Sequence, residues 1–148
     1  MAIAKWKDNL EKFGNLGGAD QWLFIRAAFW LLIARIRLAV VPFRTLSARL
    51  SREQQTNTKA PDPDLLNRIG RAVAVAANHV PWRSDCFPQT IAARTLLKHY
   101  GLASTIHFGV ERVGEEDLAG HAWLTCGGTV VTGDTDLDRY TEMHQLSS

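Results

Sequence analysis

Apolar residues recur every three or four positions in the middle of the chain, which is the period of a helix that buries one side. In "PDLLNRIGRAVAVAANHV" (63–80) they fall on one helical face, and Pro63 lies in the first turn, where its missing N–H is tolerated. The segment 86–100 predicts a second helix, and Gly101 follows it where a left-handed residue commonly ends a helix. The pattern therefore predicts two successive amphipathic helices.

After the second helix the apolar period drops to two, which is typical of strands with one buried face. The alternating segments are 104–113, 121–126 and 129–133, and Gly127 and Gly128 between the last two predict a short hairpin. Because helices come first and hairpin-connected strands follow, we expect an α+β fold with a small antiparallel sheet.

The N-terminal third predicts further helices. A weak helical pattern covers 4–13 and is broken by the sequence Asn-Leu-Gly-Gly. A strong helix is expected over 20–39, with Asp20 as its N-cap, and residues 43–50 are expected to form one more short helix beyond Pro42.

The strongly apolar stretch 22–43 does not meet the requirements of a membrane span. Such a span needs about 20 mostly apolar residues, whereas Arg26, Arg35 and Arg37 interrupt this stretch. We favour a core helix with arginines at its margins. The alternative is a helix whose excess apolar surface docks a partner protein or lies on a membrane.

A polar run with two prolines, "SREQQTNTKAPDPD" (51–64), predicts an exposed linker. The chain would then comprise an N-terminal helical segment (1–50), which is a possible docking element, this linker, and a core at 65–148. A length of 148 residues and an apolar fraction of 46% are ordinary for a globular protein with a real core.

Charge and cysteine content narrow the class of protein. A formal net charge of +2 is too small to indicate nucleic-acid binding by itself. Two cysteines cannot form a disulfide framework, and the first ten residues carry charges where a secretory signal would be apolar. We therefore expect a cytoplasmic protein in a reducing compartment.

Cys86 opens the second predicted helix, with Ser84 and Asp85 as possible N-caps. Unpaired N–H groups and the positive end of the helix dipole favour a thiolate there, and the same N–H groups can bind an oxyanion. The ordinary alternative is a small buried hydrophobe, because most lone cysteines are inert.

A cysteine nucleophile needs a base, and a third group should orient that base. His121 begins the strand 121–126, and the hairpin brings Asp134 close to its level, with Asp136 as the alternative acid. Singly, these are an ordinary strand histidine and a turn aspartate. The order of cysteine at a helix start, histidine on a strand and aspartate on the next strand makes catalysis the stronger interpretation.

The second cysteine, Cys126, lies an odd number of residues from His121 and is expected to point to the opposite sheet face, into the core. Structural zinc sites usually have four ligands at recognisable spacing, which the sequence lacks. We expect neither a metal site nor a cofactor.

These residues carry a resemblance to a known family. The blocks "CFPQTIAARTLLKHYGL", "IHFGV", "GHAWLTCGG" and "VVTGD" resemble transglutaminase-like (papain-like) cysteine proteases, and more closely the leader peptidase of lasso-peptide biosynthesis, the stand-alone protease half of the lasso B protein. The leading helix is similar as well. Gly120 departs from the family pattern, which often has alanine before the histidine.

The resemblance implies a cysteine peptidase that removes the leader of a ribosomally made precursor peptide before macrocyclisation. It implies Cys86 as nucleophile, His121 as base and Asp134 as orienting acid, with Trp123 as core packing or as a wall beside the site. It also implies a separate leader-recognition protein and an ATP-dependent cyclase as partners. Alternatives are a non-catalytic peptide-binding module and an acyl or amide transferase with the same triad.

Overall fold

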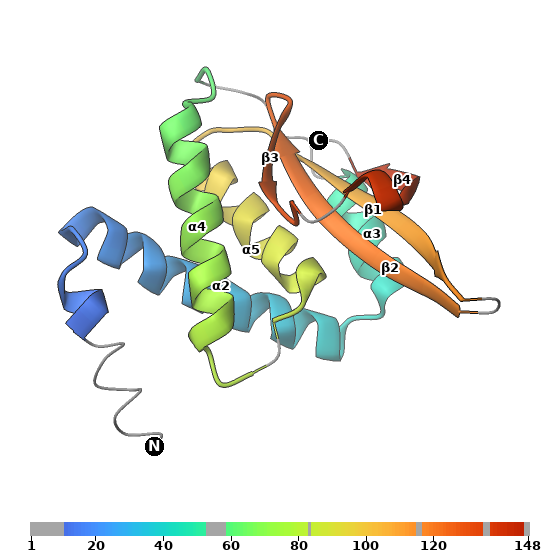
Figure 1. The fold of residues 1–148 in the computed structure, drawn as a ribbon, viewed down its shortest axis with the longest axis horizontal. Coiled ribbons are helices and arrows are strands. Elements are labelled where there is room, and N and C mark those ends of the chain that lie inside the picture. The colour runs from blue at the N-terminus through green and yellow to red at the C-terminus, as the bar shows by residue number, and fades with distance from the viewer. Residues whose placement is uncertain (1–10, 53–58, 83, 115–116, 135–136, 147–148) are drawn as a thin grey trace.

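The computed structural model describes residues 11–52, 59–82, 84–114, 117–134 and 137–146. Four labelled helices pack beside an antiparallel sheet of four strands in the order β3-β2-β1-β4 (Figure 1). Helices and strands are segregated along the chain, so the predicted α+β class is confirmed.

The helices begin and end near the predicted positions. Asp62 caps the first turn of α4 through a 3.1 Å hydrogen bond from the Asp64 N–H to its carboxylate. Gly101 has a φ of 72° at the end of α5, as expected of a left-handed C-terminal residue. The helices are α2 (Gly18–Val40), α3 (Phe43–Arg52), α4 (Pro63–His79) and α5 (Cys86–His99).

The sheet contains the three predicted strands and one that was not predicted. Gly127 and Gly128 have φ values of 57° and 81°, so the glycine hairpin is confirmed. The additional strand pairs with the outer edge of β1 and follows a short 3-10 helix, η1. The elements are β1 (Thr105–Val113), β2 (Asp117–Cys126), β3 (Thr129–Thr132), η1 (Leu137–Arg139) and β4 (Thr141–Leu146).

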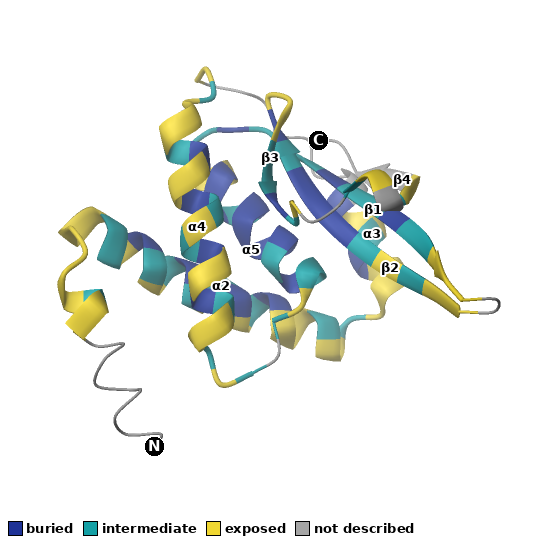
Figure 2. Cartoon of the chain, viewed as in Figure 1, coloured by how far each residue is buried: buried dark blue, intermediate teal, exposed yellow. Residues whose placement is uncertain are grey.

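One face of the sheet closes the core. Ile106 and Leu124 are partners in the β1–β2 register, are fully buried, and belong to the same cluster as apolar residues of all four helices. Figure 2 shows this burial where α5 lies between the sheet and helices α2 and α4. By strand alternation His107, His121 and Trp123 lie on the other face.

Three expectations for the N-terminal third need correction or restriction. Asp20 is not the N-cap of α2, because the helix begins earlier, after Gly17; its carboxylate instead pairs with Arg68 at 2.7 Å. The predicted helix over 4–13 lies mostly outside the described residues. The interpretation of α2 as a simple core helix is incomplete, because one of its faces carries exposed large apolar side chains.

In the described part of the chain, no helix combines the length and the apolarity that crossing a membrane would require.

Gly70 marks the tightest approach between helix and sheet. A β-carbon at this position of α4 would collide with the backbone carbonyl of Val131 in β3. We predict that Gly70→Ala lowers the free energy of unfolding by about 1–3 kcal/mol, because backbone cannot yield as a side chain can. Urea or thermal unfolding measures the change.

The matched control is Gly18→Ala at the start of α2, where no atom lies within 4 Å of a new β-carbon. It should change stability by less than about 1 kcal/mol. Equal effects of the two substitutions would contradict the close α4–β3 contact.

Candidate active site

Cys86 is the first residue of α5, and its side chain is half-buried. Asp85 occupies the N-cap position, but its side chain makes no capping hydrogen bond to the helix. Pro88 has no N–H, and the Gln89 N–H already bonds the Asp85 carbonyl at 3.3 Å. The first-turn donors left for a ligand are therefore the N–H groups of Cys86 and Phe87.

An aromatic cluster holds the first turn of α5 against the sheet. The Phe87 ring packs on Phe108 of β1 at a centroid distance of 5.2 Å and on Phe43 of α3 at 5.3 Å. Phe43 and Phe108 also contact each other, edge to face, at 5.8 Å. Because Phe87 adjoins Cys86 in the chain, these contacts fix the backbone that carries the thiol.

Three buried polar atoms in segments next to the candidate residues have no hydrogen-bond partner in the described part of the structure. Within the described residues, the buried Trp82 Nε1 and Ser84 Oγ in the loop before α5, and Thr132 Oγ1 at the end of β3, have none. An unpaired buried polar group costs free energy that a hydrogen-bonding ligand can recover.

The imidazole of His121 has a defined orientation. Its Nε2 lies 2.8 Å from the carbonyl oxygen of Gly133, and its ring stacks on Tyr140 at 4.8 Å and on Trp123 at 6.1 Å. A carbonyl oxygen only accepts, so Nε2 carries the hydrogen of this bond. In the neutral ring, Nδ1 is then the basic nitrogen.

Gly133 is required at the position that holds His121. Its φ is 79°, and an added β-carbon would lie 2.7 Å from the Ala122 carbonyl oxygen and 2.8 Å from Cβ of Trp123. Glycine alone allows both this backbone conformation and this close approach. Asp134 follows directly and is exposed, while Asp136, the alternative acid, lies outside the described residues.

The structure does not link the side chains of the proposed triad. Cys86 begins α5, His121 lies in β2 and Asp134 follows β3 by two residues, and α5 packs on both of these strands. Among the described residues, however, no hydrogen bond joins any two of the three. His121 lies on the sheet face that points away from α5.

The sheet has an open edge beside His121. Within the described residues, β2 is paired with β3 only from Leu124 to Cys126. From Asp117 to Trp123 its β3-side edge has no strand partner, so His121 lies at an open edge of the sheet.

Trp123 is 7% exposed and stacks on His107 with ring planes 4° apart, on the His121 side of the sheet. His107 Nδ1 lies 2.7 Å from a carboxylate oxygen of Glu142, and its Nε2 lies 2.8 Å from Thr125 Oγ1. The sequence pattern did not reveal the hydrogen bonds of His107 or the stacking of Tyr140 on His121, because Glu142 belongs to the unpredicted strand. The one signal in the sequence was that alternation places His107 and His121 on the same face of the paired strands β1 and β2.

Cys126 is confirmed as a core residue. It is 1% exposed on the helix-facing side of the sheet, and burial raises the pKa of its thiol. In the part of the chain that the structure describes, no group of three or more histidine, cysteine or acidic side chains is placed to hold a metal ion.

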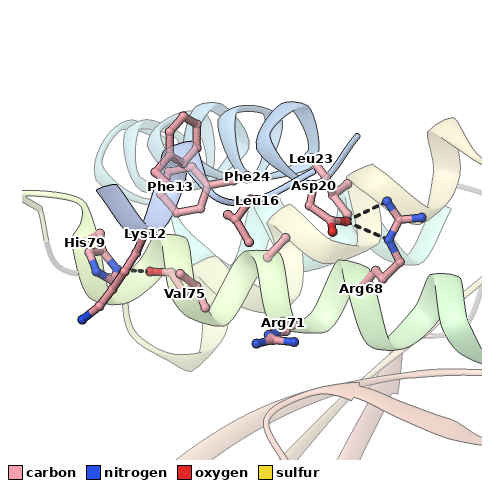
Figure 3. Close-up of a pocket in the computed structure, with 11 residues that line it drawn as sticks. Lys12, Phe13, Leu16, Asp20, Leu23, Phe24, Arg68, Arg71, Val75 and His79 are labelled. Atoms are coloured by element: carbon pink, nitrogen blue, oxygen red, sulfur yellow. Dashed lines mark hydrogen bonds and ion pairs between the residues drawn. The ribbon is translucent and has the colours of Figure 1, made fainter. Parts of the chain in front are cut away.

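One cavity in the structure lies away from these residues. It has a volume of about 280 Å³ and lies between the N-terminal part of α2 and α4 (Figure 3). Its walls include Leu23, Phe24 and Val75, and the Asp20–Arg68 ion pair lies at its rim. Neither Cys86 nor His121 lines it.

Comparison with known families identifies the class of protein. Residues 28–145 match the family model of the Transglutaminase-like superfamily, and the chain belongs to this superfamily. The match spans the second half of α2, helices α3, α4 and α5, and the sheet except the last residue of β4. No curated protein and no solved structure matches the chain significantly.

We predict that the two cysteines differ in reactivity toward iodoacetamide. Cys86 is half-buried at a helix end, whereas Cys126 is buried and its thiol is held protonated, and the thiolate is the reactive species. At neutral pH, peptide mass spectrometry should find Cys86 alkylated at least about tenfold faster in the native protein. After denaturation in guanidinium both should react alike, and equal native rates would contradict the assigned environments.

Proposed function

We propose that the protein is a cysteine peptidase that removes the leader from a ribosomally made lasso-peptide precursor before macrocyclisation. The observation that carries the proposal is a cysteine at the first position of the central helix in a chain of the Transglutaminase-like superfamily. The fixed His121 ring beside Gly133 and Asp134 supports the same chemistry. The restriction to lasso-peptide leaders depends on the sequence resemblance alone.

The proposed reaction proceeds through a thioester. Nδ1 of His121 takes the proton of the Cys86 thiol, and the thiolate attacks the carbonyl carbon between leader and core. The N–H groups of Cys86 and Phe87 donate to the oxyanion. The C–N bond then breaks, the protonated His121 gives its proton to the departing core amine, and the leader remains on sulfur.

Water completes the cycle. His121 removes a proton from a water molecule that attacks the thioester carbonyl, and the leader departs as a carboxylic acid while the thiol re-forms. The Gly133 carbonyl keeps hydrogen on Nε2 and so leaves Nδ1 free for both proton transfers. Asp134 is proposed to support the imidazolium that forms twice in each cycle.

The mechanism requires the imidazole to reach the α5 side of the sheet. The unpaired edge of β2 beyond Leu124 offers the route, since the described residues place no strand there. We propose that substrate binding is accompanied by this side-chain movement, with the leader-recognition protein presenting the precursor.

Two other functions use the same residues. An acyl or amide transferase would direct an amine rather than water onto the thioester, and the mass of the product distinguishes it from a peptidase. A non-catalytic binding module would hold the precursor uncleaved. No hydrogen bond links Cys86, His121 and Asp134 in the structure, so the cleavage assay also tests this alternative.

We predict that Cys86→Ala and His121→Ala each abolish leader removal, because the first removes the nucleophile and the second its base. Asp134→Ala should lower the rate and leave residual turnover. The assay incubates purified protein with a precursor peptide, with and without its recognition protein, and reads cleavage by mass spectrometry.

Matched controls are Cys126→Ala and His79→Ala, which remove the same residue types away from the proposed site. Both should retain cleavage, and circular dichroism should show that all variants are folded. Cleavage that survives Cys86→Ala would rule out the peptidase, and tight precursor binding without cleavage by the intact protein would establish the binding module.

A further inference from the structure

A continuous row of large apolar side chains covers the outward side of α2. At about 100° per residue these positions fall within an arc of about 80°. Their exposed fractions range from 37% for Leu32 to 75% for Val40. We call this row the α2 seam; its members are Trp22, Ile25, Phe29, Leu32, Ile36 and Val40.

The α2 seam is not an extension of the protein core. The buried residues of α2 are Leu23, Ala27, Leu31 and Ala34, and their helical arc is centred about 170° from the seam. One apolar face is enough to attach a helix to a domain. Packing of α2 on the domain therefore explains why the buried face is apolar, but it does not explain why the opposite, exposed face is apolar.

The spacing of the seam matches a helix partner. Successive members are separated by three or four residues, which is the spacing of side chains that interdigitate with a second helix. An arc of about 80° is narrower than the stripe of about 100° or more that a helix buries in a broad apolar surface. The seam thus favours a single partner helix over a membrane.

The charges beside the α2 seam indicate which charges a partner should carry. Arg26 and Arg37 lie along one margin and Arg35 along the other, and residues 21–52 contain no acidic residue. A second copy of α2 would bring arginine against arginine. The seam combines exposed tryptophan and phenylalanine with arginine rather than lysine, a composition enriched at the centres of protein interfaces.

We propose that the α2 seam binds an amphipathic helix of a partner protein that carries apolar residues at alternating three- and four-residue spacing, with aspartate or glutamate at both margins. From Trp22 to Val40 the seam is about 27 Å long, so it accommodates about five turns of helix. This binding does not depend on the chemistry at Cys86.

The test uses two designed peptides of about 25 residues with the same leucine and isoleucine seam. One has glutamate at the flanking positions and the other has lysine, and each is titrated with the full chain by fluorescence anisotropy. We expect the glutamate peptide to bind at least tenfold more tightly than the lysine peptide. Raising the salt concentration should reduce the difference, because it screens exposed charges.

Two substitutions locate the binding surface. Phe29→Asp in the seam should weaken binding of the glutamate peptide at least tenfold, whereas Leu118→Asp, at a position 67% exposed on β2, should leave it unchanged. Arg35→Glu should reduce the preference for the glutamate peptide, because only Arg26 and Arg37 remain beside the seam. Circular dichroism and thermal unfolding verify that each variant is folded.

Other outcomes overturn the proposal. Equal affinity for both peptides would show apolar adhesion without charge recognition. A dimer in analytical ultracentrifugation that Phe29→Asp abolishes would assign the seam to a second copy. Seam-dependent binding to vesicles of phosphatidylcholine and phosphatidylglycerol, without peptide binding, would assign it to a membrane surface, and no binding to any probe would remove the assignment.

Discussion

The burial of α5 is the constraint on which the rest of the fold depends. Eight of its 14 residues are buried, and it contacts α2 and α4 on one side and the sheet on the other. A helix enclosed in this way cannot rotate or slide without disturbing several packed surfaces at once. Its first residue, Cys86, is consequently held in place by the core rather than by local interactions.

Arg94 adds a polar contact to this apolar packing. It is 2% exposed, and its Nη2 donates a 2.9 Å hydrogen bond to the carbonyl of Leu50 in the last turns of α3. A cation beside the carboxyl end of a helix complements the dipole there and satisfies a carbonyl that lacks a helical partner. The buried charge thus ties the end of α3 to the middle of α5.

The sequence allowed most element boundaries to be predicted because proline, glycine and aspartate punctuate them. It did not reveal β4, whose pairing with β1 is long-range and interrupted by an irregularity between Phe108 and Gly109. Arg94 was also missed as a core residue, since a hydrophobic pattern counts arginine as exposed. For α2, the pattern shows that both faces are apolar but cannot show which one the core covers.

The candidate site was only partly predictable for a related reason. Residue types and their order suggested Cys86, His121 and Asp134, but the group that orients His121 in the structure is the backbone carbonyl of Gly133. A carbonyl has no side-chain signature. The clue available in the sequence was the glycine itself, which the close contact with Ala122 and Trp123 requires.

The short length of β3 leaves the edge of β2 beside His121 without a strand partner in the described residues. Alternation along β2 directs Cys126 and Leu124 toward the helices, and by the same rule it directs His121 and Trp123 away from α5. Had β3 continued antiparallel to β2 past Thr132, it would have closed the edge beside His121. Because Gly133 turns the chain there, the edge stays unpaired within the described residues and leaves the route that the proposed movement of the imidazole requires.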